Sequence, residues 1–461
     1  MGRKKEEIVI EDSPYVQHSK KHALGISVVE GSAVSIATNV SWSFATPFML
    51  ALGGNSFHVG LFSAISGLVD PFGRLKGSKL MEKYSRKKLV LIGKALVILS
   101  YFLSIFLIYF FFKNWFVLYL PLILILFLAV LNPFASGVGH VAWFSWMGDL
   151  VPAKIRGKYF AKRNRVTGFA GLIAFISAAF LLDFFKTRGY VLFGFSVLFG
   201  ISILFRLAAR YLIGKQFNPQ FRVKRGYYFS FLDFVKRYDN YGKFAFFQAV
   251  FYFSVMVSSP FFAVYMLEDL GFSYVMFTTV IMSSTFFYLI FVPLAGKFSD
   301  KYGNVKLLYV AAILFPLVPV LWIFLKNPIA LILLPGLISG IANSAYILGV
   351  TNFSYDAAPP QKRGLCLAYT SILIGVGILA GSLLGGVLIQ YLPMLFGFVK
   401  PIFFVFALSA LLMIMTSLFF LPQIKEERGT ERMRGLRVDF AHPFETIHSD
   451  VVWFKNFIHE K

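Results

Sequence analysis

Long apolar runs dominate this sequence and limit what it can fold into. Most are long enough to cross about 30 Å of hydrocarbon, which takes about 20 helical residues. Because backbone polar groups in hydrocarbon must be satisfied within the segment, each run is expected to form an α-helix. The sequence therefore predicts an all-α polytopic membrane protein with twelve transmembrane helices, at residues 31–52, 57–77, 88–112, 116–146, 166–184, 189–213, 243–267, 273–296, 305–325, 328–353, 364–391 and 397–421.

Basic residues are divided unevenly between the two sets of connections. Of the 45 Lys and Arg, one set holds only Lys113, Lys186, Arg188, Lys326 and Lys400. The positive-inside rule then predicts that both termini and segment 214–242 are cytoplasmic, which suits a multi-pass protein of the plasma membrane. A net charge of +23 would suggest nucleic acid in a soluble chain, but membrane topology explains it here, and no nucleic-acid partner is expected.

A charged turn occurs twice along the chain. Segments 78–88 (SKLMEKYSRKK) and 296–306 (GKFSDKYGNVK) align so that Glu82 meets Asp300 and Lys83 meets Lys301. A second pattern, D-x-x-P-x-x-x-R-G, begins at Asp149 and again at Asp356. Two matched landmarks, more than 200 residues apart in each case, predict a duplicated six-helix unit.

The turn at 296–306 resembles the signature between the second and third helices of the major facilitator superfamily, G-x-L-x-D-R/K-x-G-R/K-R/K. Gly296, Asp300, Lys301 and Gly303 match it, whereas the first copy has serines at both glycine positions. The D-x-x-P-x-x-x-R-G pattern is similar to one that follows helices 4 and 10 of that family. The resemblance implies two pseudo-symmetric six-helix bundles that rock about a midplane site.

Five segments follow from these boundaries. We expect bundles at 31–213 and 243–422, a cytoplasmic arm at 1–30 and a cytoplasmic tail at 423–461. The linker at 214–242 mixes basic and aromatic residues, which favours a segment lying on an anionic membrane surface. A target for a regulatory partner is the alternative interpretation of the linker.

Polar side chains recur at helical spacing in four predicted spans. The resemblance implies that helices 1, 4, 7 and 10 line the central cavity, which makes these side chains candidates for binding a solute. The alternative is hydrogen bonding between helices. The candidates are Asn39, Trp42, Asn132, Ser136, His140, Gln248, Tyr252, Asn343 and Tyr346.

Ionisable residues inside membrane spans are candidates for function because charge there is costly. Asp70, Arg74 and Lys94 lie inside the second and third predicted spans. A structural ion pair of Asp70 with Arg74 or with Lys94 is favoured over proton carriage. Arg163 and Arg165 enter the fifth span and could face an anion.

A cytoplasmic gate is the expected role of the two repeated motifs. An acid followed by bases can clamp neighbouring helix ends, and the resemblance implies that these clamps stabilise the outward-open state. The expected gate residues are Glu82, Lys83, Arg86, Asp149, Arg156, Gly296, Asp300, Lys301, Gly303, Asp356 and Arg363.

The predicted function is secondary transport of a small solute by alternating access, either coupled to an ion or proton or facilitative, by a monomer in the lipid bilayer. A non-transporting sensor on the same fold is one alternative. A membrane-embedded lipid-handling enzyme is less favoured, because the sequence has no paired acids, nucleophile–base set or metal cluster. No catalytic residue, metal or cofactor is therefore predicted.

Overall fold

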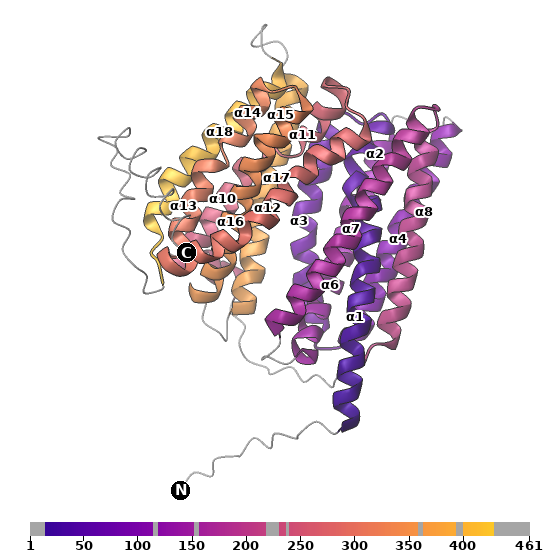
Figure 1. Ribbon diagram of the computed structural model, residues 1–461, viewed down its shortest axis with the longest axis vertical. Helices are drawn as coiled ribbons and strands as arrows, with labels where there is room; N and C mark the ends of the chain where they lie inside the picture. The colour runs from indigo at the N-terminus through magenta and orange to yellow at the C-terminus, as the bar shows by residue number, and fades with distance from the viewer. Residues whose placement is uncertain are drawn as a thin grey trace.

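The computed structural model describes residues 14–113, 119–151, 156–217, 230–236, 239–357, 363–392 and 400–427. Every regular element within these ranges is a helix, so the prediction of an all-α protein is confirmed. Eleven helices of the described chain are long and apolar enough to cross a membrane. The twelfth rod is α3 (Ser56–Leu80), which stands beside the others in Figure 1 and is less apolar because it contains Asp70, Arg74 and several glycines.

The described chain forms two halves, which we call the N-half (α1 to α8) and the C-half (α10 to η6). In the N-half, helix follows helix as α1 (Pro14–Ser41), η1 (Trp42–Phe44), α2 (Ala45–Ala51), α3 (Ser56–Leu80), α4 (Arg86–Phe112), α5 (Leu120–Leu124), η3 (Ile125–Leu131), α6 (Asn132–Leu150), α7 (Arg156–Lys186) and α8 (Val191–Lys215). The C-half contains α10 (Asn240–Met256), α11 (Phe261–Val264), η5 (Tyr265–Asp269), α12 (Tyr274–Tyr302), α13 (Asn304–Leu314), α14 (Leu317–Phe324), α15 (Pro328–Leu333), α16 (Pro335–Ala357), α17 (Arg363–Tyr391), α18 (Pro401–Phe420) and η6 (Leu421–Gln423).

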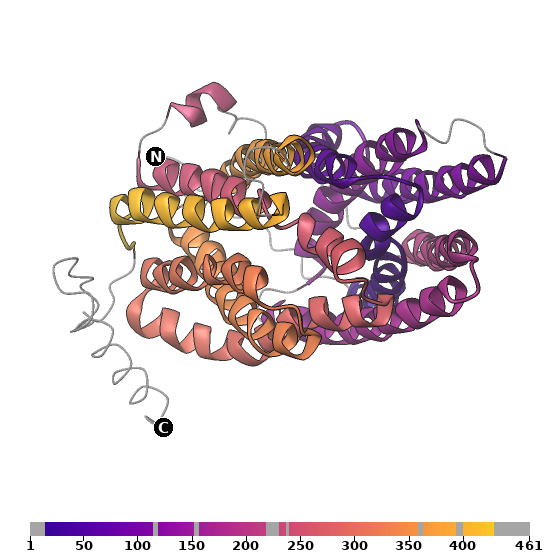
Figure 2. The ribbon, with the colours of Figure 1, turned by 90° about the horizontal axis from the view of Figure 1, so that it is seen from above.

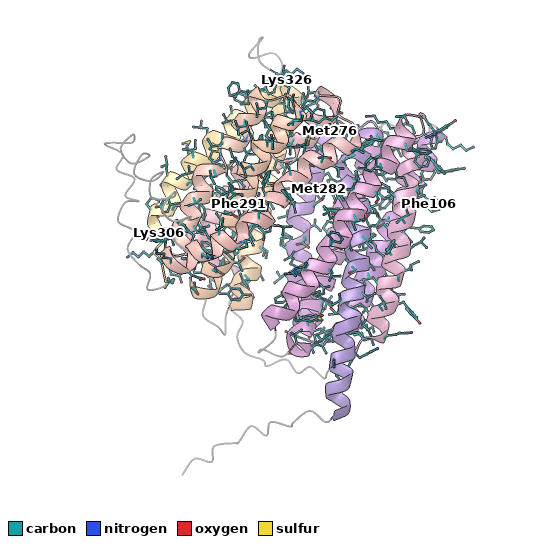
Figure 3. All side chains as sticks on the ribbon, in the orientation of Figure 1. Phe106, Met276, Met282, Phe291, Lys306 and Lys326 are labelled. Carbon is teal, nitrogen blue, oxygen red and sulfur yellow. The ribbon has the colours of Figure 1, made fainter. Side chains whose placement is uncertain are left out.

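The two halves stand side by side, approach each other at one end and diverge at the other (Figures 1 and 2). We call the diverging end, where Ser85, Gln216 and Gly303 lie, the linker face. The opposite end is the far face, and it carries the turns at Gly53 and Gly271. Figure 3 places Lys326 at the far face and Lys306 toward the linker face, while Phe106 points outward, half exposed, on the lipid side.

Helix α17 packs against both halves through glycines. A Cβ atom on Gly60 of α3 would lie 3.1 Å from the Cα of Gly386, and one on Gly375 would lie 2.9 Å from the carbonyl oxygen of Gly67. On its other side, Gly381 of α17 faces the backbone of α10 at Phe253. Small residues let helix backbones approach closely in a membrane, and they allow α17 to lie between α3 and α10.

The first helix begins well before its predicted start. The span was expected from residue 31, whereas α1 begins at Pro14 and the apolar rod includes Lys21–Ala51. Glu30, which the sequence assigned to the polar arm, is therefore inside the bundle and only 3% exposed. A charge near the end of an apolar run does not mark the end of a membrane helix when partners bury it.

The repeated charged turn differs between its two copies in backbone conformation. Helix α12 continues through the charged segment to Tyr302, and Gly303 makes the turn with φ +100° and ψ 166°, a region that essentially only glycine adopts. At the aligned position, Ser85 has φ −63° and its hydroxyl accepts a hydrogen bond from the backbone N–H of Lys88 at 3.3 Å. Serine therefore suits the first turn as an N-cap, and glycine is needed only in the second.

Parts of the linker and tail pack on the linker face of the C-half. The short helix α9 (Phe231–Val235) buries Phe234 against the rings of Tyr241 and Tyr369. From the tail, a carboxylate oxygen of Glu426 accepts a hydrogen bond from the backbone N–H of Val305 at 2.8 Å and so caps the start of α13. The remaining residues of the predicted linker and tail lie outside the described residues, except for Gly214–Phe217 and Ser230–Lys236 of the linker, the start of α10, and the tail up to Glu427.

Replacing Gly303 by alanine is expected to destabilise the protein by about 1–3 kcal/mol, because alanine must adopt the same strained backbone conformation. Gly296→Ala is the matched control: it lies in the same helix–turn segment, and its added Cβ would meet only Leu348 Cδ2, at 3.9 Å. Thermal unfolding of the purified protein in detergent measures both. An unfolding midpoint for Gly303→Ala equal to that of Gly296→Ala would contradict this account of the turn.

Candidate functional site: a charged cavity in the N-half

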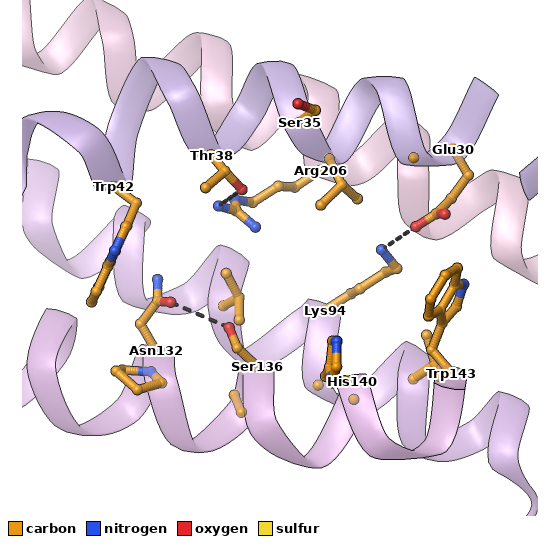
Figure 4. A pocket seen from close by; sticks show the side chains of 18 of the residues that line it. Glu30, Ser35, Thr38, Trp42, Lys94, Asn132, Ser136, His140, Trp143 and Arg206 are labelled. Atoms are coloured by element: carbon orange, nitrogen blue, oxygen red, sulfur yellow. Dashed lines mark hydrogen bonds and ion pairs between the residues drawn. The ribbon is translucent and has the colours of Figure 1, made fainter. Parts of the chain in front are cut away.

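A cavity of about 600 Å³ lies inside the N-half, between α1, α3, α4, α6, α7 and α8. Figure 4 shows Thr38 and Trp42 of α1 facing Asn132, Ser136 and His140 of α6 across it. Many of its lining residues are polar, and five are charged at neutral pH: Glu30, Asp70, Lys94, Arg163 and Arg206. So many charges in one membrane bundle mark the cavity as the leading candidate for a functional site.

Glu30 is the centre of a buried ion cluster. Its Oε1 lies 2.6 Å from Nζ of Lys94, and its Oε2 lies 3.6 Å from Nη2 of Arg163. Arg163 also donates from Nε to the carbonyl oxygen of Ser27 at 3.2 Å and stacks its guanidinium 4.6 Å from the ring centre of Trp143. One acid thus holds together α1, α4 and α7 and neutralises charge from two cations.

Asp70 forms the ion pair with Arg74 that the sequence offered as one of two options. The pair joins Nε of Arg74 to Oδ2 of Asp70 at 2.8 Å, one turn apart on α3. The other option, a bridge from Asp70 to Lys94, is not what the structure has, because Lys94 is bound to Glu30. Asp70 is still partly open to the cavity, with 28% of its side chain exposed.

Arg206 of α8 enters the same cavity with neutral partners. Its Nε donates to the Ser202 hydroxyl at 3.2 Å, and its Nη2 donates to the Thr38 hydroxyl at 3.4 Å. The guanidinium carbon lies 4.9 Å from the centre of the Tyr101 ring, a cation–π contact. No carboxylate lies within ion-pair distance of Arg206 in the part of the chain that the structure describes.

The predicted stripe on α6 faces the cavity, but it is not uniform. Asn132 is buried and donates to the Ser100 hydroxyl at 3.0 Å, and the Ser136 hydroxyl lies 3.4 Å from the Asn132 side-chain oxygen. His140 is exposed to the cavity, with its ring near that of Phe144. Asn39, a candidate on α1, instead lies against Gly171 of α7 and donates to the carbonyl oxygen of Ser35 at 2.9 Å.

A second cavity, of about 470 Å³, lies inside the C-half. Of the predicted candidates it is lined by Tyr252, Asn343 and Tyr346, and none of its lining residues is charged. The Asn343 amide donates to the carbonyl oxygen of Ser339 at 2.8 Å, while the Tyr346 hydroxyl is buried with no hydrogen-bond partner among the described residues. Gln248 is buried behind the cavity rather than lining it.

The predicted gate residues all come from elements at the linker face. Glu82 and Lys83 are exposed in the turn between α3 and α4, and Asp300 is exposed near the end of α12, followed by half-buried Lys301. Gly296, expected to admit a close neighbour, has only Leu348 within 4 Å of an added Cβ. The side chains of two further gate residues, Arg156 and Arg363, lie outside the described residues.

Two corresponding contacts fasten the helix ends within each half. The fully buried Arg86 guanidinium at the start of α4 binds Asp149 at the end of α6, with Nη1 to Oδ2 at 2.6 Å. At the aligned positions, the Asn304 amide at the start of α13 donates to Oδ2 of Asp356 at the end of α16, at 2.9 Å. The repeated acids are thus equivalent in space, while the partner is a cation in one half and an amide in the other.

Three charged residues of the N-half cavity were missed or left unassigned from the sequence. Glu30 was placed in the arm, Arg206 was passed over within the sixth span, and Arg163 had no partner proposed. A signal existed for Glu30 and Thr38, which are two helical turns apart and therefore share a face. Arg206 lies within the apolar run 189–213, where any cation merits a functional hypothesis.

The sequence model of the Major Facilitator Superfamily matches residues 31–228 and 244–458, which include both halves. The chain belongs to this superfamily. The fold agrees: a bacterial homologue of the iron transporter ferroportin, solved in an inward-facing state, superposes with a TM-score of 0.67 at 14% identity, over 88% of this chain and 98% of that one. As a superfamily member the protein is a multi-pass membrane protein of a transporter family.

Two yeast members of the curated proteins match part of the chain. The vacuolar basic amino acid transporter 1 of Saccharomyces cerevisiae is 31% identical over 141 residues, which are 30% of this chain and 24% of that protein. An uncharacterized transporter of Schizosaccharomyces pombe is 32% identical over 111 residues, or 24% of this chain and 19% of that one. The chain therefore spans a quarter or less of these relatives.

Removing the acid of the ion cluster is expected to be costly. Glu30→Gln leaves Lys94 and Arg163 without their shared anion, and breaking a buried ion pair typically costs about 3–5 kcal/mol. Lys94→Met in the Glu30→Gln background removes one of the stranded cations and should recover part of the loss. Thermal unfolding in detergent measures the cycle. Equal midpoints for Glu30→Gln and the wild type would refute the structural importance of this cluster.

Proposed function

We propose that the protein is a secondary active transporter that moves a small solute by alternating access, with the solute bound between the two halves. The observation that carries the proposal is the polar cavity in the N-half, which places charged side chains among membrane-crossing helices. The uncharged C-half cavity supplies aromatic rings and hydroxyls from the other bundle. Two bundles with one cavity each suit a solute that both halves contact in turn.

The arrangement of the halves supports an inward-open state. Under the positive-inside rule the linker face is cytoplasmic, as are both termini and residues 214–242, and the membrane is the plasma membrane. At this face, the contacts of the gate motifs given above connect helices of the same half: Arg86 binds Asp149, and Asn304 binds Asp356. The proposed clamps between halves would form when the linker face closes, in the outward-open state.

The far face is held shut by a contact between the halves. Asp183 of α7 accepts hydrogen bonds from the first two backbone N–H groups of α12, Tyr274 to Oδ1 at 2.7 Å and Val275 to Oδ2 at 2.9 Å. The ring of Tyr274 also lies 5.2 Å from Nζ of Lys186 and packs edge-on against Phe195. A carboxylate at a helix N-terminus is favourable both as a cap and because it opposes the helix dipole.

Reconstitution into proteoliposomes tests the proposal directly. Uptake and efflux of amino acids, sugars, nucleosides and organic anions would be measured with and without a pH gradient, against protein-free liposomes. Saturable movement of at least one class is expected. If uptake follows the pH gradient, His140 is the proposed proton-binding group, since it is exposed in the cavity and an ordinary histidine titrates near pH 6.5. Solute binding without movement across the membrane would instead favour a sensor.

Weakening the far-face contact is expected to open that face. Asp183→Asn loses the charge and one of two acceptor oxygens, at a cost of about 1–2 kcal/mol, which would shift the conformational equilibrium about 5- to 30-fold. An impermeant thiol reagent applied outside intact cells would then label Ser66→Cys in the cavity faster, while the native Cys366 is buried and silent.

Two controls accompany this labelling experiment. Asp269→Asn removes another far-face acid, one that pairs with Lys400 within the C-half at 2.5 Å, and should leave the labelling rate unchanged. A cysteine at position 220, in the predicted cytoplasmic linker, should react only after the cells are permeabilised. Equal labelling of the Asp183 and Asp269 variants would mean that Asp183 does not hold the far face closed.

A further inference from the structure

Arg206 has more hydrogen-bonding capacity than the protein uses. A guanidinium carries five N–H donors. Two of them are engaged, by the hydroxyls of Ser202 and Thr38. Within the described chain the other three have no protein partner, and the guanidinium borders the 600 Å³ cavity of the N-half. Arginine at this depth is therefore both charged and only partly coordinated.

The acids of the same cavity are already engaged. Glu30 is 3% exposed and lies between Lys94 and Arg163, and Asp70 is bound to Arg74 at 2.8 Å. Counting the lining residues alone, two acids face three cations, and Arg74 adds a fourth cation next to Asp70. A solute with an ammonium group would have to displace one of these cations, whereas a solute with an anionic group would find Arg206 without an acidic partner.

The surroundings of Arg206 suit a planar anionic group. Its guanidinium is held in place by Tyr101 on one face and by two hydroxyls at its edge, which leaves the rest of the fork open toward the cavity (Figure 4). A guanidinium fork matches the geometry of carboxylate and phosphate, which it can bind through two parallel hydrogen bonds. Trp42, which also lines the cavity, offers an apolar ring beside this position.

We infer that the transported solute carries a carboxylate or phosphate group and binds it to Arg206, with its uncharged body against the aromatic walls of the two cavities. This inference rests on the proposed transport function and gives its substrate class: an organic anion. The C-half cavity has no charged lining residue, so it can accept only the uncharged part of such a solute. The basic amino acids in the name of the yeast relative are a different class, for which this cavity has no free acid.

Binding to the full-length purified protein tests the inference without requiring transport. Trp42 and Trp143 line the cavity, so their fluorescence should report a ligand. The probes are benzoate and phenyl phosphate as anions, benzamide as the neutral counterpart of benzoate, and benzylamine and L-lysine as cations. We expect saturable binding of at least one anion and at least tenfold weaker binding of the neutral and cationic probes. The benzoate and phenyl phosphate arms distinguish a carboxylate from a phosphate substrate.

Variants of α8 assign the binding to Arg206. Arg206→Gln should weaken anion binding at least tenfold, and Arg206→Lys should give an intermediate loss because it keeps the charge without the fork. Arg210→Gln is the matched control: it lies one turn further along α8, is exposed, and donates to the carbonyl oxygen of Leu91 at 3.3 Å outside the cavity. It should bind anions within twofold of the wild type. Unfolding midpoints establish that each variant is folded, and Arg206→Lys serves if Arg206→Gln is not.

The outcomes separate this inference from the proposed function. Failure of both anions to bind, equal binding of benzylamine or L-lysine, or unchanged anion affinity in both Arg206 variants would overturn the organic-anion assignment. Uptake of a cationic or neutral solute by liposomes in the same case would leave the transport function standing. Conversely, Arg206-dependent anion binding with no uptake or efflux of the bound anion would support the site and refute transport.

Discussion

Charge inside a membrane must be compensated by the protein, and this constraint organises the N-half. A charged side chain at the centre of a bilayer costs at least about 2.5–3.5 kcal/mol. Glu30, Lys94 and Arg163 meet the requirement together, drawing α1, α4 and α7 toward one point. Gly31 belongs to the same arrangement, because a Cβ there would lie 2.7 Å from the guanidinium carbon of Arg163. The cavity is the space around this cluster that the side chains leave open.

The two halves share an architecture but differ in chemistry. Their repeated acids occupy equivalent places at the linker face, yet Asp149 binds a buried arginine and Asp356 binds an asparagine amide. Their cavities differ in the same direction, since charged residues line the first and uncharged residues line the second. Duplication therefore preserved the positions of the helices while the side chains diverged, and a solute that bridges the halves meets a charged wall and an aromatic wall.

Hydropathy predicted most of the fold because lipid leaves few alternatives. An apolar run of sufficient length must be helical, and the repeated motifs set the division into two sets of six. The first helix was the main error in the fold, since Glu30 was taken as the end of the apolar segment although Lys94 and Arg163 bury it. Burial by partners distant in sequence cannot be deduced from local hydropathy.

The candidate site was less predictable because a helix has several faces. Periodicity put Asn39 and Trp42 among the cavity candidates, but only Trp42 lines a described cavity, while Asn39 packs on Gly171. Gln248 and Tyr252 differ in the same way. Rotation of each helix about its axis depends on the neighbouring helices, here on close glycine contacts such as that of Gly381 with α10. Spacing alone does not contain that information.

The far-face contact at Asp183 is unequal in its tolerance of mutation. On the α7 side it depends on one carboxylate, whereas on the α12 side both donors are backbone N–H groups. Positions 274 and 275 could therefore exchange side chains and still supply both hydrogen bonds, unless proline removed a donor. Relatives that keep this closure should vary freely at the start of α12 but retain an acceptor at position 183, so sequence drift would be concentrated on one side of a contact that both halves share.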